Sequence, residues 1–382
     1  MREFTLSASD MMRRALELAE EGRGHVSPNP LVGAVIVRDG QVVGEGYHAE
    51  LGRAHAEVVA LEAAGEAARG ATMHVTLEPC SHDGRTPPCT DAIVDAGIAR
   101  VVYAAADPHP EAAGGAAALR AAGVEVERAG PAEIESAVRQ NATFLWSVVA
   151  GRPFVALKLA MTIDGKLAAA SGRRTEITGP EAWERVHRLR ADADAVLVGR
   201  GTVTADDPRL TARAETEPRE QPIRVVLDSL ASLASDSALV SGVGDAPVVV
   251  VAAGDAHPDR LRVLREAGVE TEISPRTPDG LLDPYVVLRR LHDRGIRSVL
   301  VEGGARTADS FLAEDLVERF HHFVGPWFIG PRGVPAFVDA GSSERDAWHL
   351  LEVDRVGDDA HMVWERRSAF DRILRAAGPD AG

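Results

Sequence analysis

The segment LEPCSHDGRTPPC, residues 77–89, places two cysteines at the end of an apolar run, with eight residues between them. The run that ends at Leu77 predicts a strand, and the pattern that begins at His55-Ala56-Glu57 predicts a helix over 55–64. One imidazole and two thiolates suit tetrahedral zinc whose fourth position is left for water. The sequence therefore predicts a zinc site made by His55, Cys80 and Cys89.

Glu57 stands two residues from the predicted histidine ligand. At that spacing it can lie beside the metal without binding it and relay protons, while zinc lowers the pKa of a water molecule enough for hydroxide to attack an amidine carbon. Zinc deaminases share the His-x-Glu and Pro-Cys pattern, although their second cysteine usually follows after two residues. Two small buried cysteines without metal are the alternative, because isolated cysteines often pack that way.

Length and composition indicate two globular domains. The chain has 382 residues, of which 45% are apolar and 26% charged, enough for two independent cores. Glycine and proline interrupt the pattern at 150–153. We predict domains over 1–148 and 152–368 and a tail over 369–382.

The charge and the cysteine content narrow the possible partners. The formal net charge of −16 disfavours broad binding to nucleic acid or to an anionic membrane. No apolar run approaches the roughly 20 residues of a membrane helix, and no secretory signal is evident. Two cysteines are too few for a disulfide scaffold. We expect a soluble cytoplasmic protein that acts on small molecules and forms a homo-oligomer.

Helix and strand signals alternate in both halves. In the first, the runs 31–37 and 41–47 flank Asp39-Gly40, which predicts a β-hairpin, and further strands and helices predict a sheet between helical layers. In the second, strands are expected at 154–159, 195–198, 223–227, 248–252 and 298–301 and helices at 180–190, 259–267 and 284–293. Both halves are thus α/β.

The second half shows weaker functional signals. Glu302-Gly303-Gly304 ends a predicted strand before a helix, where backbone N–H groups can approach a phosphate. Residues 198–202 also follow a strand, where open α/β sheets bind ligands. Lys158 lies inside an apolar strand, where a lysine more often extends its amine to solvent than catalyses. These features predict a ligand site but no particular reaction.

At the level of whole motifs, residues 77–89, 28–33 and 44–48 resemble the bifunctional riboflavin-biosynthesis deaminase–reductases. The resemblance implies a cytidine-deaminase-like three-layer α/β/α first domain, one zinc ion and Glu57 as proton shuttle. Family members commonly carry asparagine where this chain has His109. The substrate contacts that the resemblance implies are Asn29, His48, His82, Arg85, Asp107 and His109.

Residues 157–166, 201–213, 223–229 and 302–304 are similar to the reductase half of the same family, which has a dihydrofolate-reductase-like α/β fold. The resemblance implies NADPH as cofactor. The implied NADPH contacts are Ala160, Thr202, Asp206, Ser229 and Gly304. The implied substrate pocket contains Lys158, Arg174, Arg190, Leu210, Arg213 and Glu302.

The resemblance implies two reactions. The first is hydrolytic deamination of 2,5-diamino-6-(5-phosphoribosylamino)pyrimidin-4-one, and the second is NADPH-dependent reduction of the ribosyl group of 5-amino-6-(5-phosphoribosylamino)uracil. One departure leaves alternatives open: Arg174 and Glu176 replace the serine and tryptophan that family members often carry. An active deaminase with a second domain that binds nucleotide without reducing is one alternative, and a nucleotide sensor or assembly module is another.

Overall fold

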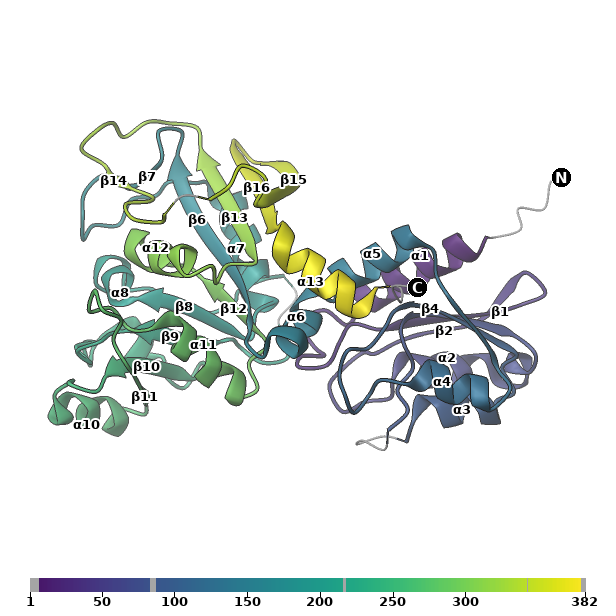
Figure 1. Cartoon of the computed structure of the whole chain (residues 1–382). Coiled ribbons are helices and arrows are strands. Elements are labelled where there is room, and N and C mark those ends of the chain that lie inside the picture. Colours follow the sequence, from purple (N-terminus) through teal and green to yellow (C-terminus); the bar gives the residue numbers. More distant parts are fainter. Residues whose placement is uncertain (1–6, 83–86, 216–217, 342, 379–382) are drawn as a thin grey trace. The chain divides into compact units, whose positions relative to one another are not determined.

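The computed structural model describes residues 7–82, 87–215, 218–341 and 343–378. The chain divides into two units: unit 1 is Met1–Ala150 together with Phe370–Gly382, and unit 2 is Gly151–Ala369. The segment that the sequence predicts as a tail forms helix α13 (Arg367–Ala377), drawn in yellow in Figure 1, which belongs to unit 1 from Phe370 on. Ile373 and Ala377 are four residues apart and both buried, so they form one apolar face of the helix that packs within unit 1.

Unit 1 is built on a mixed sheet with strand order β2-β1-β3-β4-β5. Strands β1 (Gly33–Arg38) and β2 (Gln41–Tyr47) pair antiparallel, which confirms the predicted hairpin. Asp39 and Gly40 both have positive φ, 53° and 77°, as a tight two-residue hairpin turn requires. Strands β3, β4 and β5 run parallel to one another, so their carboxyl ends meet at one edge.

Helices cover both faces of this sheet, as predicted. Figure 1 shows α1 and α5 on one face and α2, α3 and α4 on the other. The remaining bounds in unit 1 are α1 (Ala8–Glu20), α2 (Ala56–Ala64), a 3-10 turn (Gly65–Ala68), β3 (Thr72–Leu77), α3 (Cys89–Asp95), β4 (Arg100–Ala105), α4 (Gly115–Ala121), β5 (Glu125–Arg128), α5 (Pro131–Gln140) and α6 (Ala142–Ala150).

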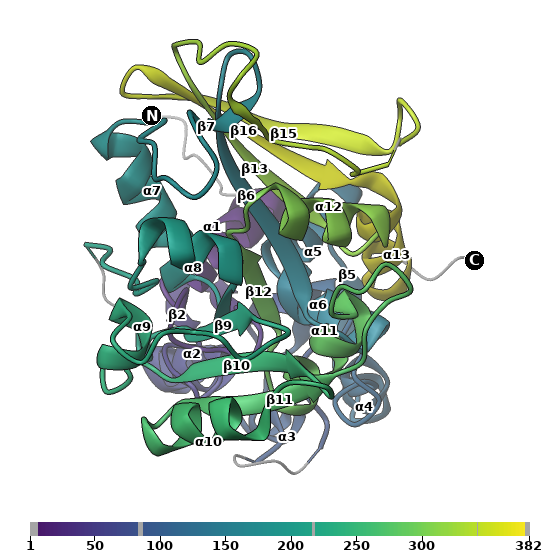
Figure 2. The ribbon, with the colours of Figure 1, turned by 90° about the vertical axis from the view of Figure 1, so that its left-hand side faces the viewer.

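Unit 2 contains a second, larger sheet with strand order β11-β10-β9-β8-β12-β6-β13-β16-β15. The strands from β11 to β13 in that order are parallel, and β16 and β15 join antiparallel. Figure 2 shows β9, β10 and β11 side by side, with α10 next to them. The predicted strands are present. The elements that were not predicted are β7 (Lys166–Ala168), α8 (Arg200–Asp206), α9 (Ala238–Ser241), β11 (Glu270–Ser274) and β14 (Val334–Pro335).

Apolar clusters on the two faces of this sheet hold its helices. Leu288 of α11 and Phe311 of α12 share one cluster with Leu157, and Leu239 of α9 and Leu264 of α10 share another with β10. The other bounds in unit 2 are β6 (Phe154–Thr162), β7 (Lys166–Ala168), α7 (Pro180–Ala191), β8 (Ala195–Gly199), β9 (Ile223–Leu227), α9 (Ala238–Ser241), β10 (Val248–Ala253), α10 (Pro258–Glu266), α11 (Pro284–Asp293), β12 (Ser298–Val301), α12 (Ala305–Ala313), β13 (Arg319–Gly325), β14 (Val334–Pro335), β15 (Trp348–Val356) and β16 (Asp359–Arg366).

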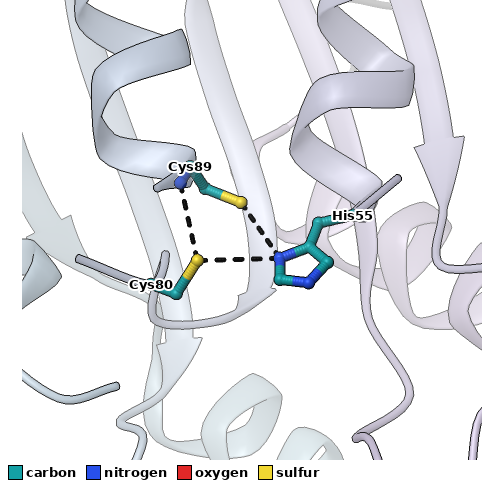
Figure 3. A group of neighbouring side chains, drawn as sticks. All are labelled: His55, Cys80 and Cys89. Atoms are coloured by element: carbon teal, nitrogen blue, oxygen red, sulfur yellow. Dashed lines mark hydrogen bonds between the residues drawn. The ribbon is translucent and has the colours of Figure 1, made fainter. Parts of the chain in front are cut away.

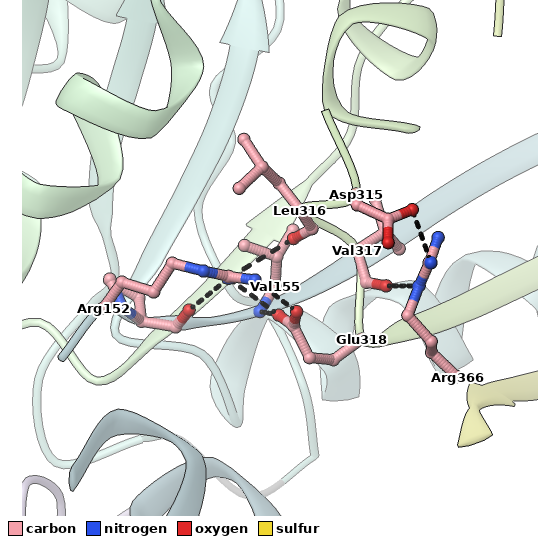
Figure 4. Close-up of polar contacts among 8 residues, drawn as sticks. Arg152, Val155, Asp315, Leu316, Val317, Glu318 and Arg366 are labelled. Carbon is pink, nitrogen blue, oxygen red and sulfur yellow. Dashed lines mark hydrogen bonds and ion pairs between the residues drawn. The ribbon is translucent and has the colours of Figure 1, made fainter. Parts of the chain in front are cut away.

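An ionic cluster joins the two ends of unit 2 (Figure 4); its Arg152 and Glu318 side chains are buried, whereas its Asp315 side chain is exposed. Near its start, the Arg152 guanidinium donates to both carboxylate oxygens of Glu318 at 2.6 and 3.1 Å, and the amide of Val155 donates to the same carboxylate. Near its end, Arg366 donates to the Val317 carbonyl and to the Asp315 carboxylate. The segment 315–318 therefore holds both ends.

In the described part of the chain, no helix is long and apolar enough to cross a membrane.

Candidate active sites

The three predicted zinc ligands come together in unit 1 (Figure 3). His55 precedes α2, Cys80 follows β3 and Cys89 begins α3. The Nδ1 atom of His55 lies 3.2 Å from Cys89 Sγ and 3.6 Å from Cys80 Sγ, and the three ligand atoms all lie within 4.8 Å of one another. The hydrogen bond between the two cysteines lowers the pKa of the Cys80 thiol, which favours its thiolate, and raises the pKa of the Cys89 thiol.

This donor set fits zinc. One imidazole nitrogen and two sulfurs leave the fourth tetrahedral position open, as in a catalytic rather than a structural zinc site. Among the described residues, no other group of three His, Cys, Asp or Glu side chains has metal-ligand spacing. Zinc is therefore the metal that these side chains suit.

Glu57 lies in the first turn of α2 and is only 3% exposed. Burial raises the pKa of its carboxyl group, although the nearby His55 opposes that shift. A carboxyl group with a raised pKa can both accept and release a proton near neutral pH. The environment of Glu57 is therefore that of a proton-transfer group.

His48 and Asn29 form a polar pair beside the zinc ligands. His48 Nδ1 lies 3.1 Å from the Ala54 carbonyl oxygen, which can only accept, so this nitrogen carries the proton. His48 Nε2 then accepts from the Asn29 side-chain amide at 3.1 Å. The rings of His48 and His55 meet edge to face at 5.4 Å. Burial lowers the pKa of His48, so the imidazole is neutral at pH 7.

Glu78 connects the zinc loop to two other segments, a role that the sequence analysis missed. Its carboxylate accepts from the Ala116 amide at 2.9 Å and from the Asp107 amide at 3.4 Å. Asp107 is buried and accepts from the His109 amide at 2.9 Å, so both predicted pocket residues lie on one ordered turn. The signal available in the sequence was an acidic residue directly after an apolar strand.

Space near Cys80 is also restricted by Gly115, the first residue of α4. A Cβ atom at this position would lie 1.7 Å from the Pro79 carbonyl oxygen. The φ of Gly115 is not positive, so the glycine is required for close approach rather than for its backbone angles.

Two predicted substrate contacts lie in the loop between the cysteines. Arg85 falls outside the described residues. His82 is described, and its Nδ1 atom is buried with no hydrogen-bond partner in the described part of the chain. A buried unpaired nitrogen carries a desolvation cost that a ligand can remove.

In unit 2, three predicted NADPH contacts lie at the carboxyl ends of neighbouring parallel strands. Thr202 follows β8, Ser229 follows β9 and Gly304 follows β12. The Gly304 amide donates to Thr202 Oγ1 at 3.1 Å, and Gly304 is the N-cap of α12. A helix N-terminus at the carboxyl edge of a parallel sheet suits a dinucleotide phosphate. The residues present therefore fit NADPH. Ala160 lies farther along β6, and Asp206 ends α8.

The predicted substrate residues of unit 2 meet beside this edge. Arg190 donates to both oxygens of Glu302 at 2.5 and 2.9 Å and to the Thr211 carbonyl at 3.2 Å. Burial opposes ionisation of Glu302, yet Arg190 keeps the pKa of this carboxyl below its ordinary value. Arg213 is exposed and lies 3.1 Å from His187 Nε2. Leu210 is buried with φ of 56°.

The side chains of Lys158 and Arg174 both contact the ring of Trp183, a residue that the sequence analysis missed. The Lys158 Nζ lies 5.3 Å from the centre of the Trp183 ring, and the Arg174 guanidinium lies 5.8 Å from it. Burial lowers the pKa of Lys158, and it raises the pKa of Asp206 although Arg174 opposes that shift. Arg174 also pairs with Glu176 at 3.6 Å. Trp183 gave no signal beyond being one apolar residue of a helix.

Both halves of the chain match models of known protein families. Residues 6–105 match the model of the cytidine and deoxycytidylate deaminase zinc-binding region, and residues 153–362 match the RibD C-terminal domain. The riboflavin biosynthesis protein RibD of Aquifex aeolicus is 44% identical over 84% of this chain and 87% of its own length. RibD of Escherichia coli is 41% identical over 92% of this chain and 98% of its own length.

Solved structures extend the agreement to three dimensions. Acinetobacter baumannii RibD superposes with a TM-score of 0.83 at 36% identity, and the match covers 94% of this chain and 98% of the other. A diaminohydroxyphosphoribosylaminopyrimidine deaminase/5-amino-6-(5-phosphoribosylamino)uracil reductase from Thermotoga maritima gives a TM-score of 0.79 at 35% identity, with the same coverage. Both family models, the near full-length relatives and the shared fold agree: this chain belongs to the RibD family of riboflavin biosynthesis proteins.

Proposed function

We propose that the chain catalyses two reactions of riboflavin biosynthesis. Unit 1 deaminates 2,5-diamino-6-(5-phosphoribosylamino)pyrimidin-4-one with release of ammonia, and unit 2 reduces the ribosyl group of 5-amino-6-(5-phosphoribosylamino)uracil to the ribityl form with NADPH. The observation that carries the first reaction is the His55–Cys80–Cys89 site with buried Glu57 beside it. The match of unit 2 to the RibD C-terminal domain carries the second.

In the deaminase, Glu57 moves the proton. Bound zinc supplies the Lewis acidity that makes water nucleophilic near neutral pH. With its raised pKa, the Glu57 carboxyl takes a proton from the attacking water and delivers it to the leaving amino nitrogen. Held by His48, the Asn29 side chain has its amide oxygen left to accept from the pyrimidine. We assign His82, Arg85, Asp107 and His109 to the remaining substrate contacts.

In the reductase, the residues of unit 2 bind and orient the sugar. NADPH, when bound, supplies the hydride. Arg190 already donates to Glu302 and to the Thr211 carbonyl, so we propose that it holds the Glu302 carboxylate in place. Arg213, unlike the buried Arg190, is exposed, and we assign it to the substrate phosphate. We assign Lys158, Arg174 and Leu210 to the same pocket, and Ala160, Thr202, Asp206, Ser229 and Gly304 to NADPH.

The proposal extends to the assembly and location of the enzyme. We propose a homo-oligomer, because β15 is an edge strand that exposes Val353 by 60% and Leu350 by 39%. We propose a cytoplasmic location, because Cys80 and Cys89 are free thiols and a reducing compartment keeps them so. The net charge of −16 disfavours nucleic acid as a partner.

The decisive experiment follows NADPH consumption and ammonia release by the zinc-loaded protein. Wild type should release ammonia from the diamino pyrimidine and then oxidise NADPH. Glu57→Gln should oxidise NADPH only when supplied with the aminouracil. If ammonia appears while NADPH stays untouched even with the aminouracil, the reductase assignment fails, and the Arg174–Glu176 departure becomes the explanation to test.

A further inference from the structure

The last helix of the chain completes unit 1, although it follows all of unit 2 in the sequence. Ile373 of α13 is 2% exposed. Arg372 donates to the Val149 carbonyl of α6 at 2.9 Å, and the Arg139 guanidinium of α5 lies 4.0 Å from the centre of the Phe370 ring. Figure 1 shows α13 beside α5 and α6. The helix is therefore packed by a buried face and by two arginine contacts.

The end of α13 contacts the end of β4. The Ala377 carbonyl accepts from the Ala106 amide at 2.9 Å and from Arg128 Nη2 at 3.0 Å. The last carbonyls of a helix have no partner within the helix, so both donors satisfy a group that would otherwise be unpaired. Arg128 also brings its positive charge to the negative end of the helix dipole. One backbone donor, Ala106, and one side-chain donor, Arg128, thus converge on the Ala377 carbonyl.

The residue that follows this contact is Asp107. Its preceding neighbour Ala106 is held by α13, and its own amide donates to Glu78, two residues before the zinc ligand Cys80. Ala105 accepts from the Glu78 amide at 2.9 Å. The turn that carries Asp107 is therefore fixed on one side by the zinc loop and on the other by α13.

We propose that α13 is a positioning element of the deaminase: by holding Ala106 through the Ala377 carbonyl, it sets the place of Asp107 against the pyrimidine. This inference rests on the proposed function, in which Asp107 contacts the substrate. It follows that residues encoded after the reductase determine how well the deaminase binds its substrate.

The test uses full-length protein in which a carboxylate is introduced on either face of α13. Ile373→Asp places a carboxylate in the buried face, whereas Arg375→Asp places one on the exposed face. Ile373→Asp should raise the deaminase KM about 10- to 100-fold, the loss of affinity that displacing one hydrogen bond to a charged group produces. Zinc content and reductase turnover should stay at the wild-type level, and Arg375→Asp should change the KM less than about twofold.

The split between KM and kcat separates positioning from loss of folded protein. Partial unfolding lowers the apparent kcat through the active fraction and leaves KM unchanged, so that pattern in Ile373→Asp would overturn the proposal, as would a wild-type KM. Arg128→Lys should retain more affinity for substrate than Arg128→Met.

Asp107→Asn tests the proposed substrate contact of Asp107 separately from the proposed role of α13. If this variant binds the diamino pyrimidine normally, the proposed contact of Asp107 fails, and the role of α13 fails with it. If Asp107→Asn raises KM while Ile373→Asp does not, the substrate contact stands and only the role of α13 is refuted.

Discussion

A single methyl group at Gly115 should disable the deaminase and spare the reductase. In Gly115→Ala the new Cβ would lie 1.7 Å from the Pro79 carbonyl oxygen, and real Cβ atoms essentially never approach closer than 3.0 Å. Either α4 or the Pro79–Cys80 segment must therefore move by more than about 1 Å, which costs on the order of 10²-fold in turnover when it displaces a catalytic group. Overpacking should also lower the stability of unit 1 by about 1–3 kcal/mol.

The assay compares zinc content, deaminase kcat/KM and reductase turnover in the same preparation. Gly244→Ala is the matched control, because a Cβ at Gly244 meets nothing within 4 Å and its φ is not positive. We expect Gly115→Ala to lose zinc affinity and deamination while it keeps NADPH oxidation with the aminouracil. Wild-type zinc affinity together with wild-type deamination would show that Pro79 and Cys80 do not depend on the glycine.

Other predictions concern single groups. Glu57→Gln should keep zinc and lose about 10²- to 10⁴-fold in deamination, since positioned acid–base groups contribute that much, and undiminished turnover would remove Glu57 from proton transfer. Cys80→Ser should lose most bound zinc, which a metal content equal to wild type would contradict. Arg152→Met should cost about 3–5 kcal/mol of stability by leaving Glu318 buried without its cation. Burial raises the pKa of Glu318 to about 7, and without Arg152 it rises further. The folded variant then holds a proton that the unfolded chain releases above pH 4.5, so urea unfolding should show lower stability at pH 8 than at pH 6; equal stability would refute the assignment.

Local sequence patterns were sufficient to predict the zinc site and the β-hairpin. His55, Cys80 and Cys89 each stand where a helix begins or a strand ends, so the predicted elements alone brought them to one edge of the sheet. Asp39-Gly40 combines two residue types that tolerate positive φ, so the local sequence already favours the tight turn.

Long-range contacts could not be predicted in the same way. Nothing near Arg190 in the sequence shows that Glu302 and Thr211 occupy its donors, because the pairs are separated by 112 and 21 residues. Trp183 looks like any apolar helix residue until β6 brings Lys158 to its ring. The packing of α13 on unit 1 joins two segments that are separated in the sequence by the whole of unit 2.

Unit 2 is an insertion within the sequence of unit 1. The Arg152–Glu318 and Asp315–Arg366 contacts hold the two ends of this insertion. The deaminase polypeptide is interrupted after Ala150 and resumes at Phe370, and both junctions are anchored to the same short segment of the insert. An insert whose ends are held by one segment imposes a small closure entropy on its host, since the ends are already brought together. The two units of this chain are therefore not joined head to tail, because unit 2 lies within the sequence of unit 1. A short flexible loop in place of 153–365 is the corresponding engineered protein, a continuous deaminase that retains its own final helix.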